Sequence, residues 1–283
     1  MKHLKTLFIP LYISLAFTGL LLAGWKIADT SSSLFAAMAL AAIAALPIGF
    51  FLSLYLTPRA RTDSQLKPLQ TASVLLTIPV AIYPDWTIAF AAAAINISGY
   101  LYIYWYSQLM RPRPDVISVG ETLPWFELTD ADGNKVTSLQ LANKPSLMIF
   151  YRGNWCPLCM AQIKEVAKAY QQLESMGIRV AMISSQPANH TKVLSEKFKV
   201  DFDWLIDNNN QAAQTLGLVD EGGTPAVFLL QGHRADTAMP TVVMTDATGK
   251  VIFADLTDNY RVRPEPETFI AIFQQHLDAG KAA

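Results

Sequence analysis

Uncharged apolar stretches dominate the first 110 residues of the chain and are separated by short polar segments. They cover residues 6–25, 30–58, 68–84 and 86–110. A helix needs about 20 predominantly apolar residues to cross the hydrocarbon core of a bilayer. The pattern therefore predicts an α-helical membrane anchor of four spans within residues 1–110. The third span, residues 69–83, is short and contains Pro79.

Basic residues gather at one end of these spans. They lie before the first span, after the second and after the fourth: Lys2, Lys5, Arg59, Arg61, Lys67, Arg111 and Arg113. Because short basic loops favour the cytoplasmic side, we expect a multi-pass protein of the bacterial inner membrane with its C-terminal half in the cytoplasm. If residues 69–83 do not span, that half lies on the opposite side.

Polar residues inside the spans suggest packing rather than transport. Aromatic residues crowd 100–106 and are typical of a membrane interface. Asn96, with Ser98 and Gly99, is typical of contact between helices. No charged residue or histidine lies in mid-span, so the sequence predicts no proton relay or ion path.

The second half of the chain has a different pattern. Residues 111–118 begin Arg-Pro-Arg-Pro, which cannot continue a helix, and predict a linker. Within residues 119–283, short apolar runs predict strands at 123–128, 135–137, 147–151, 178–183, 202–206, 226–230, 241–244 and 250–253. Helical periodicity covers 163–173, 187–198, 211–216 and 265–277. This order predicts an α/β domain with a central mixed sheet flanked by helices.

The chain has only two cysteines, Cys156 and Cys159, and both lie between a predicted buried strand and an amphipathic helix. The free N–H groups and the dipole of a helix N-terminus stabilise an anion. A thiol at that place has a lowered pKa, and the thiolate is its reactive form. Pro157 suits the first helical positions. The spacing brings both sulfurs onto one side and predicts a redox-active pair.

Two other interpretations of the pair are weaker. Buried cysteines can simply pack a core, but the strand–helix context favours chemistry. A zinc site would need two more ligands, and His190, His233 and His276 show no close ligand spacing. We therefore expect neither a metal nor a cofactor. The net charge of −1 gives no reason to expect a nucleic-acid partner.

Several motifs then resemble a known superfamily over about residues 115–280. They are L-P-W-F-E-L at 123–128, D-A-D-G at 130–133, and F-Y-R-G-N-W-C-P-L-C at 150–159. The segment resembles the thioredoxin-fold redoxins, particularly the peroxiredoxin-like alkyl hydroperoxide reductase and thiol-specific antioxidant group. The resemblance implies a thioredoxin-like fold, a peroxide or protein disulfide as substrate, and an external reductant of the thioredoxin or glutathione type.

The resemblance leaves the roles of the two cysteines open. In the peroxiredoxin pattern P-x-x-x-T-x-x-C, Arg152 stands at the proline, Cys156 at the threonine and Cys159 at the attacking cysteine. In the thioredoxin pattern W-C-x-x-C, Cys156 attacks and Cys159 resolves. Peroxiredoxins also have an arginine just before the late strand, where this chain has Met239 and Pro240.

Three further residues complete the expected site. Arg152 is expected to stabilise the thiolate, or else to be a solvated turn residue. Trp155 is expected to shield the sulfurs, or else to pack the core. Pro240 is expected to be the cis-proline that thioredoxins place beside the cysteines, with Thr224-Pro225 as the rival segment.

The sequence thus predicts a membrane-anchored, thiol-dependent antioxidant enzyme that uses Cys156 and Cys159 to reduce peroxides. Two alternatives stay open. One is a thioredoxin-like thiol–disulfide oxidoreductase, and the other is a membrane-tethered redox sensor without turnover. The sensor is motivated by the anchor, since one span would suffice for tethering.

Overall fold

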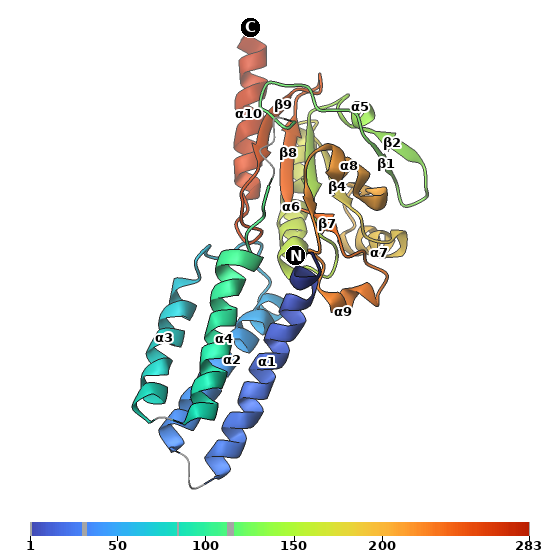
Figure 1. Ribbon diagram of the computed structural model, residues 1–283. Helices are drawn as coiled ribbons and strands as arrows, with labels where there is room; N and C mark the ends of the chain where they lie inside the picture. Colours follow the sequence, from blue (N-terminus) through green and yellow to red (C-terminus); the bar gives the residue numbers. More distant parts are fainter. Residues whose placement is uncertain (1, 30–32, 84, 112–115, 283) are drawn as a thin grey trace.

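The computed structural model describes residues 2–29, 33–83, 85–111 and 116–282. Within them, the chain forms a bundle of helices at one end and an α/β domain at the other (Figure 1). Residues 112–115, which belong to the expected linker, lie outside the described residues.

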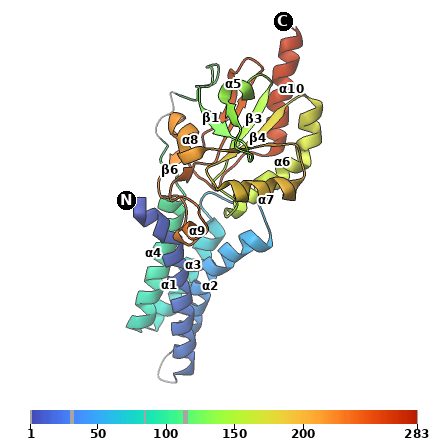
Figure 2. The same cartoon turned by 90° about the vertical axis from the view of Figure 1, so that its right-hand side faces the viewer.

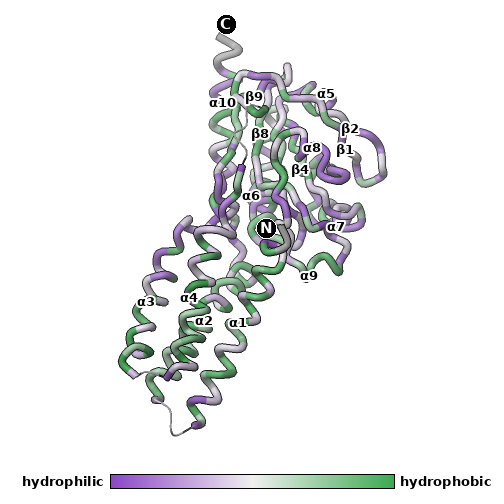
Figure 3. Tube along the Cα trace, in the orientation of Figure 1, coloured by the Kyte–Doolittle hydropathy of each residue, from purple (hydrophilic) through white to green (hydrophobic). Residues whose placement is uncertain are grey.

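The bundle consists of four helices: α1 (Lys2–Ala28), α2 (Leu34–Leu56), α3 (Lys67–Ile82) and α4 (Trp86–Leu101). A π-helical turn, η1 (Tyr102–Tyr106), continues α4. The helices run alternately down and up, so the start of α1 and the end of η1 both lie next to the α/β domain (Figures 1 and 2). Hydrophobic residues dominate the bundle along its length (Figure 3).

Three helical segments are long and apolar enough to cross a membrane: Leu4–Ala28, Leu34–Leu56 and Trp86–Tyr106. The expected third span is a helix, α3, but it has only 16 residues. At 1.5 Å per residue it is about 24 Å long, short of the roughly 30 Å hydrocarbon core. Within the described residues, the expected count of four full-length spans is therefore corrected to three, with α3 as a shorter fourth helix of the bundle.

The α/β domain contains a seven-stranded sheet in the order β2-β1-β5-β4-β3-β8-β9. Its strands are β1 (Glu127–Thr129), β2 (Lys135–Thr137), β3 (Ser146–Phe150), β4 (Arg179–Ser184), β5 (Asp203–Ile206), β8 (Thr241–Thr245) and β9 (Val251–Asp255). β3, β4 and β5 run parallel, whereas β8 and β9 are antiparallel to their neighbours. This mixed sheet confirms the predicted α/β class, with a thioredoxin-like arrangement at its centre.

Helices cover both faces of the sheet. One face packs against α6 (Pro157–Ser175), α7 (Ala188–Phe198) and α10 (Pro266–Ala282). The other packs against α8 (Gln211–Thr215), near the short helices α5 (Ser138–Leu141) and η2 (Asn208–Asn210). Because both faces are covered, every residue of β3 is buried, which explains why this strand has no alternating pattern in the sequence.

The segment between α8 and β8 differs from the prediction. Two short strands, β6 (Val219–Asp220) and β7 (Thr237–Ala238), form a separate ladder. Between them, the expected strand 226–230 is a short helix, α9 (Ala226–Leu229), so that prediction was wrong. No residue of α9 is buried. A short apolar run does not distinguish a strand from a helical turn, and here it lies at the surface beside the bundle rather than in the sheet.

Polar contacts join the bundle to the α/β domain. The buried Arg261 guanidinium donates to Thr62 Oγ1 at 3.0 Å and to the carbonyl of Ser64 at 2.8 Å. Tyr102 in η1 shares a 2.8 Å hydroxyl hydrogen bond with Tyr260. The hydrophobic core is also continuous from the bundle into the domain. The two parts therefore pack as one body.

Candidate active site

The two cysteines lie at the turn between β3 and α6. Cys156 is the residue immediately before α6, and Cys159 is in its first turn, with Pro157 at the first helical position. Neither cysteine forms a disulfide. Their exposed fractions are only 1% for Cys156 and 0% for Cys159. The turn requires Gly153, whose φ is +145° and where a Cβ would lie 2.7 Å from Trp155 Nε1.

A buried arginine contacts both sulfurs. Arg263 lies between β9 and α10 and donates from Nη2 and Nη1 to Cys159 Sγ at 3.4 and 3.5 Å. Its Nη2 lies 4.0 Å from Cys156 Sγ. Gln162 Oε1 and the carbonyl of Tyr260 accept from the same guanidinium at 2.8 and 3.0 Å. These partners fix the orientation of the charge toward Cys159.

The electrostatics divide the pair into a thiolate and a thiol. Burial acts to raise the pKa of Cys159, but the hydrogen bond from the Cys156 thiol and the positive charge of Arg263 outweigh it. The net result is a pKa well below the ordinary value of a cysteine. Burial raises the pKa of Cys156 well above that value. These directions favour the negative charge on Cys159 and the proton on Cys156.

Arg152 lies close to the pair, but its side chain has other partners. It is 3% exposed and ion-pairs with Asp220 at 3.4 Å. Its guanidinium stacks on Trp155 and Tyr260, at 5.0 and 4.8 Å from the ring centroids, and donates to the carbonyl of Gly223. Arg152 is therefore not a solvated turn residue. Its backbone N–H adds to the lowering of the pKa of Cys159, after the Cys156 thiol and Arg263, and its positive charge acts to lower the pKa of Cys156.

Polar residues hold the cysteine turn from the side of α7. Gln186 Oε1 accepts from the backbone N–H of Asn154 at 2.8 Å, and Gln186 Nε2 donates to Tyr151 Oη at 3.1 Å. The Asn154 amide nitrogen lies 2.9 Å from His190 Nδ1, and the His190 ring stacks on His233. The turn is thus anchored on the sheet as well as on the helix.

The expected proline does not have the expected geometry. No peptide bond among the described residues is cis, so the predicted cis bond before Pro240 was wrong. Thr241 pairs with Phe150, which places Pro240 one residue before that pair at the sheet end that carries the cysteine turn. Its carbonyl accepts from Arg111 Nη2 at 2.7 Å. The rival Pro225, in contrast, lines a cavity at Cys156.

This cavity has a volume of about 70 Å³ and lies between the cysteine turn and the bundle. Cys156, Trp155 and Phe228 contribute to its wall from the α/β domain. Ile9 and Leu54 contribute from α1 and α2. The Trp155 and Phe228 rings stack at 5.2 Å with an interplanar angle of 23°. Trp155 and the membrane-type helices α1 and α2 therefore border the cavity at Cys156.

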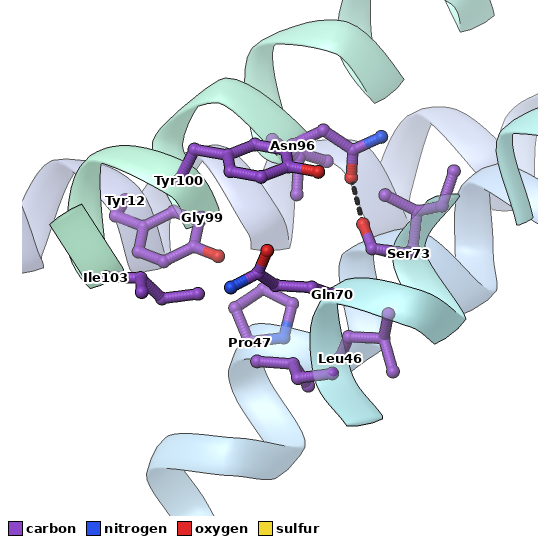
Figure 4. Close-up of a pocket in the computed structure, with 12 residues that line it drawn as sticks. Tyr12, Leu46, Pro47, Gln70, Ser73, Asn96, Gly99, Tyr100 and Ile103 are labelled. Atoms are coloured by element: carbon purple, nitrogen blue, oxygen red, sulfur yellow. Dashed lines mark hydrogen bonds between the residues drawn. The ribbon is translucent and has the colours of Figure 1, made fainter. Parts of the chain in front are cut away.

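A second cavity lies inside the bundle (Figure 4). Its volume is about 30 Å³, the share of a single water molecule in the liquid, about 30 Å³. Ser73 donates to Asn96 Oδ1 at its edge, linking α3 to α4. A Cβ on Gly99 would lie 3.1 Å from Tyr12 Oη. These polar and small residues hold helices together, as the sequence predicts for Asn96 and Gly99.

Arg263 is the contact that the sequence patterns missed. It lies 104 residues from Cys159 along the chain, in the segment N-Y-R-V-R-P before the last helix. The peroxiredoxin pattern places an arginine just before the strand that is β8 in this chain. Here the arginine that contacts the cysteines, Arg263, follows β9 instead. The one local signal is a pair of arginines, Arg261 and Arg263, that bracket Val262 in a segment leading into a helix.

The fold and this site together define a thioredoxin-fold dithiol protein. Residues 119–254 match the AhpC/TSA family, so the α/β domain is peroxiredoxin-like, and the bundle lies outside the matched residues. Chloroplastic peroxiredoxin Q of Sedum lineare is 28% identical over 102 residues, which are 36% of this chain and 55% of that protein. Peroxiredoxin Bcp of Escherichia coli K12 is 25% identical over 147 residues, which are 51% of this chain and 90% of that protein. The chain spans about half the length of the peroxiredoxin Q relatives.

Solved structures with a similar fold align with about half of the chain. Peroxidoxin BcpB from Mycobacterium tuberculosis has a TM-score of 0.46 at 18% identity, covering 56% of this chain and 97% of its own. Reduced Prx3 from Vibrio vulnificus in complex with hydrogen peroxide has a TM-score of 0.48 at 20% identity, covering 56% and 99%.

Proposed function

We propose that the protein is a membrane-anchored, thiol-dependent peroxide reductase. One observation carries this proposal: Arg263 directs two N–H groups at Sγ of Cys159, the position that the peroxiredoxin pattern gives to the attacking cysteine, and this contact helps to lower the pKa of that thiol. Cys156 lies beside it as a protonated thiol, ready to resolve the oxidised form. The match of residues 119–254 to the AhpC/TSA family supports the same chemistry.

The first step is attack by the Cys159 thiolate on one oxygen of the peroxide. A sulfur–oxygen bond forms, the oxygen–oxygen bond breaks, and the leaving oxygen takes up a proton to become water or an alcohol. Cys159 becomes a sulfenic acid. Arg263 donates toward the place where negative charge moves from sulfur to oxygen, so it stabilises the reacting charge without reorganising. Cys156 lines the cavity, so its side chain must turn aside to let the peroxide reach Cys159.

The second step closes the disulfide. The Cys156 sulfur attacks the sulfenic sulfur of Cys159, the sulfur–sulfur bond forms, and water leaves. An external dithiol of the thioredoxin type, or glutathione, then reduces the disulfide by thiol–disulfide exchange. Because both cysteines are in one turn, this step needs no large rearrangement of α6. The buried sulfurs do require local opening for a protein reductant.

The bundle supports anchoring in a lipid bilayer. Its exposed side chains include large apolar residues along α1, α2 and α4, such as Leu21, Leu52 and Phe90. Contact of these side chains with water is unfavourable, and a lipid bilayer would cover them. We propose a multi-pass protein of the bacterial inner membrane in which α3, although short, returns the chain across the bilayer, because the start of α1 and the end of η1 both lie beside the α/β domain (Figure 1). The thiol domain is then on the side that basic loops favour, the cytoplasm. In that compartment the pair rests as thiols, and a disulfide is a catalytic event.

Steady-state turnover by the full chain in lipid nanodiscs tests the proposal. With a thiol reductant present, the wild-type protein is expected to consume peroxide, and Cys159→Ser to consume none. Cys156→Ser is expected to react once with peroxide and then stall or over-oxidise. Wild-type turnover by the Cys159→Ser variant would refute the assignment.

Disulfide reduction is the second candidate function. The W-C-x-x-C sequence at 155–159 supports it, and Cys156 is the sulfur that lines the cavity. Reduction of insulin disulfides by the wild-type protein, together with no consumption of peroxide, would favour this function over the peroxidase. A pair whose redox state follows oxidant without any turnover would instead indicate a sensor.

A further inference from the structure

The first turns of α1 make polar contacts with the α/β domain. Lys5 Nζ forms an ion pair with Asp220 Oδ1 at 2.5 Å, and Thr6 Oγ1 donates to the carbonyl of Gly222 at 2.9 Å. These partners lie 215 and 216 residues away along the chain. The side chains of Lys5 and Asp220 are only 13% and 4% exposed. One end of a membrane-type helix is therefore fixed to the domain, next to β6 (Figure 2).

The same carboxylate also reaches the cysteine turn. Asp220 Oδ2 pairs with Arg152 Nη2 at 3.4 Å, so each carboxylate oxygen has its own cation. Arg152 Nη2 also donates to the carbonyl of Gly223, and the carbonyl of Arg152 accepts from Thr237 Oγ1 at 2.7 Å. Thr237 lies opposite Asp220 in the ladder of β6 and β7. The contacts therefore run from α1, through Asp220, to the cysteine turn itself.

The loop that carries this carboxylate is held on several sides. A Cβ on Gly223 would collide with Asp220 Oδ2 and would lie 3.0 Å from Thr237 Cγ2, so only glycine leaves room for the carboxylate. Asp236 Oδ1 accepts from the backbone N–H of Gly222 at 2.8 Å. Because the loop is fixed in this way, loss of its contact with α1 is transmitted to Arg152 rather than absorbed by the loop.

The buried side chains of this network carry a net positive charge. Lys5 and Arg152 contribute two cations, and Asp220 contributes one carboxylate. Since Lys5 shares the carboxylate, part of the guanidinium charge of Arg152 is not cancelled. Burial has the largest effect on the pKa of Cys156 and raises it, whereas the charges of Arg263 and then of Arg152 act to lower it. The cation that completes this balance comes from α1.

From this geometry we propose that Lys5 is a positioning residue of the active site, which acts through Asp220 and Arg152 to favour closure of the disulfide. The inference rests on the proposed peroxidase function. In its second step the Cys156 thiol gives up its proton and its sulfur attacks the sulfenic sulfur of Cys159. The sulfur–sulfur bond forms, and the hydroxide that leaves takes up the proton to become water. Positive charge beside Cys156 stabilises its sulfur as the proton leaves.

This role of Lys5 goes beyond the orientation of the membrane spans. In the sequence, Lys5 is one of the basic residues that predict the orientation, and in the structure it pairs with a carboxylate of the thiol domain. The first step of peroxide reduction depends instead on Arg263, which contacts Cys159 from the segment before α10. Loss of the Lys5 charge should therefore slow the second step and spare the first.

The test separates the two steps in the full chain in nanodiscs. The reduced protein is mixed with one equivalent of hydrogen peroxide and quenched in acid at successive times, and mass spectrometry gives the amounts of the reduced, sulfenic and disulfide forms. Lys5→Met removes the ion pair with Asp220, and Lys5→Arg keeps the charge. The matched control is Lys26→Met. Lys26 lies on the same helix, is 11% exposed and pairs with Asp85 at 2.6 Å, at the other end of the bundle.

The inference expects disulfide closure to be about tenfold slower in Lys5→Met, the size expected for the loss of one hydrogen bond to a charged group. Lys5→Arg should restore most of this rate. Peroxide attack in Lys5→Met, and both steps in Lys26→Met, should stay within about twofold of the wild-type rates. A variant that is merely less folded would lose amplitude in both steps, without a slower second step.

Thr6→Val is a second variant, for the case in which Lys5→Met does not fold. It removes only the hydrogen bond to Gly222, so disulfide closure should slow about two- to fivefold while peroxide attack is unchanged. Closure at the wild-type rate in Lys5→Met, or in Thr6→Val where the first variant does not fold, would overturn the inference and leave the peroxidase intact. Equal slowing in Lys26→Met would overturn it too. A wild-type protein whose cysteines do not react with peroxide would refute the proposed function, and the inference with it.

Discussion

Replacing Arg263 with methionine tests the origin of the thiolate. Methionine fills a similar space but removes the charge and the donors at 3.4 and 3.5 Å from Cys159 Sγ. Hydrogen bonds to charged groups contribute about 1.5–3 kcal/mol. Because 1.36 kcal/mol corresponds to one pKa unit, the pKa of Cys159 should rise by about one to two units, and at a pH below the new pKa the thiolate fraction, and with it the rate of peroxide reduction, should fall about 10- to 100-fold.

Two assays read this change. Thiolate absorbance near the ultraviolet edge follows the ionisation of Cys159, and stopped-flow kinetics give the rate with peroxide. In the variant the pKa of Cys159 rises, so both profiles move to higher pH, and raising the pH restores part of the rate. Arg263→Lys keeps the charge without the paired donors, so its pKa for Cys159 and its rate should lie between those of the wild-type protein and of Arg263→Met. Arg179→Met is the matched control, because Arg179 lies at the start of β4 and pairs with Asp203.

The outcome that would refute this reasoning is specific. If Arg263→Met keeps the wild-type pH profile while it remains folded, the charge does not set the ionisation of Cys159. If the rate falls at every pH without a shift of the profile, Arg263 acts on the leaving oxygen and not on the thiolate.

Three other perturbations have expected results. Arg152→Met removes one of two cations that pair with the buried Asp220, which keeps Lys5, and should lower the free energy of unfolding by about 1–3 kcal/mol in denaturant titrations, less than the roughly 3–5 kcal/mol of a buried charge left without any partner; an unchanged midpoint would contradict the buried ion pair. Gly153→Ala adds a Cβ that collides with Trp155 at a φ of +145°, so its thermal midpoint should fall, and a wild-type midpoint would show that the turn relaxes freely. Burial, and then the neighbouring His190, lower the pKa of His233 from 6.5 to about 4. The unfolded chain therefore binds this proton first, and stability should fall as pH drops from 6.5 toward 4, a slope that His233→Phe should reduce.

The cysteine turn was predictable because its determinants are local. The buried strand β3, the turn with Gly153, and the amphipathic face of α6 all lie within one continuous segment. Each has a short-range signal in composition or periodicity. The position of Cys156 and Cys159 between a strand and a helix followed from that segment alone.

The charge that acts on the cysteines was not predictable in this way. Arg263 reaches Cys159 from 104 residues away, and no periodicity reports such a contact. Arg152, adjacent in sequence, was the natural candidate, but its guanidinium turns toward Asp220 and the aromatic rings. Tertiary packing therefore decided between two arginines that the sequence could not rank.

The bundle shows the same limit. Hydropathy located all four helices, but the length of α3 depends on where Leu66 and Tyr83 end it. The closeness of α2 to the cysteine turn depends on long-range contacts, such as that of Arg261 with Ser64. The apolar run that became α9 lacked a neighbouring strand, and strand pairing is a property of the whole sheet rather than of the run.

The most direct test of the central claim is the site of first oxidation. The Cys156→Ser variant of the full chain, in nanodiscs, is mixed with one equivalent of peroxide and a reagent that traps sulfenic acids, and the labelled peptide is identified by mass spectrometry. The account predicts rapid labelling of Cys159, with little labelling of Cys156 in the matched Cys159→Ser variant. Rapid labelling of Cys156 in Cys159→Ser, with an unreactive Cys159 in Cys156→Ser, would contradict it.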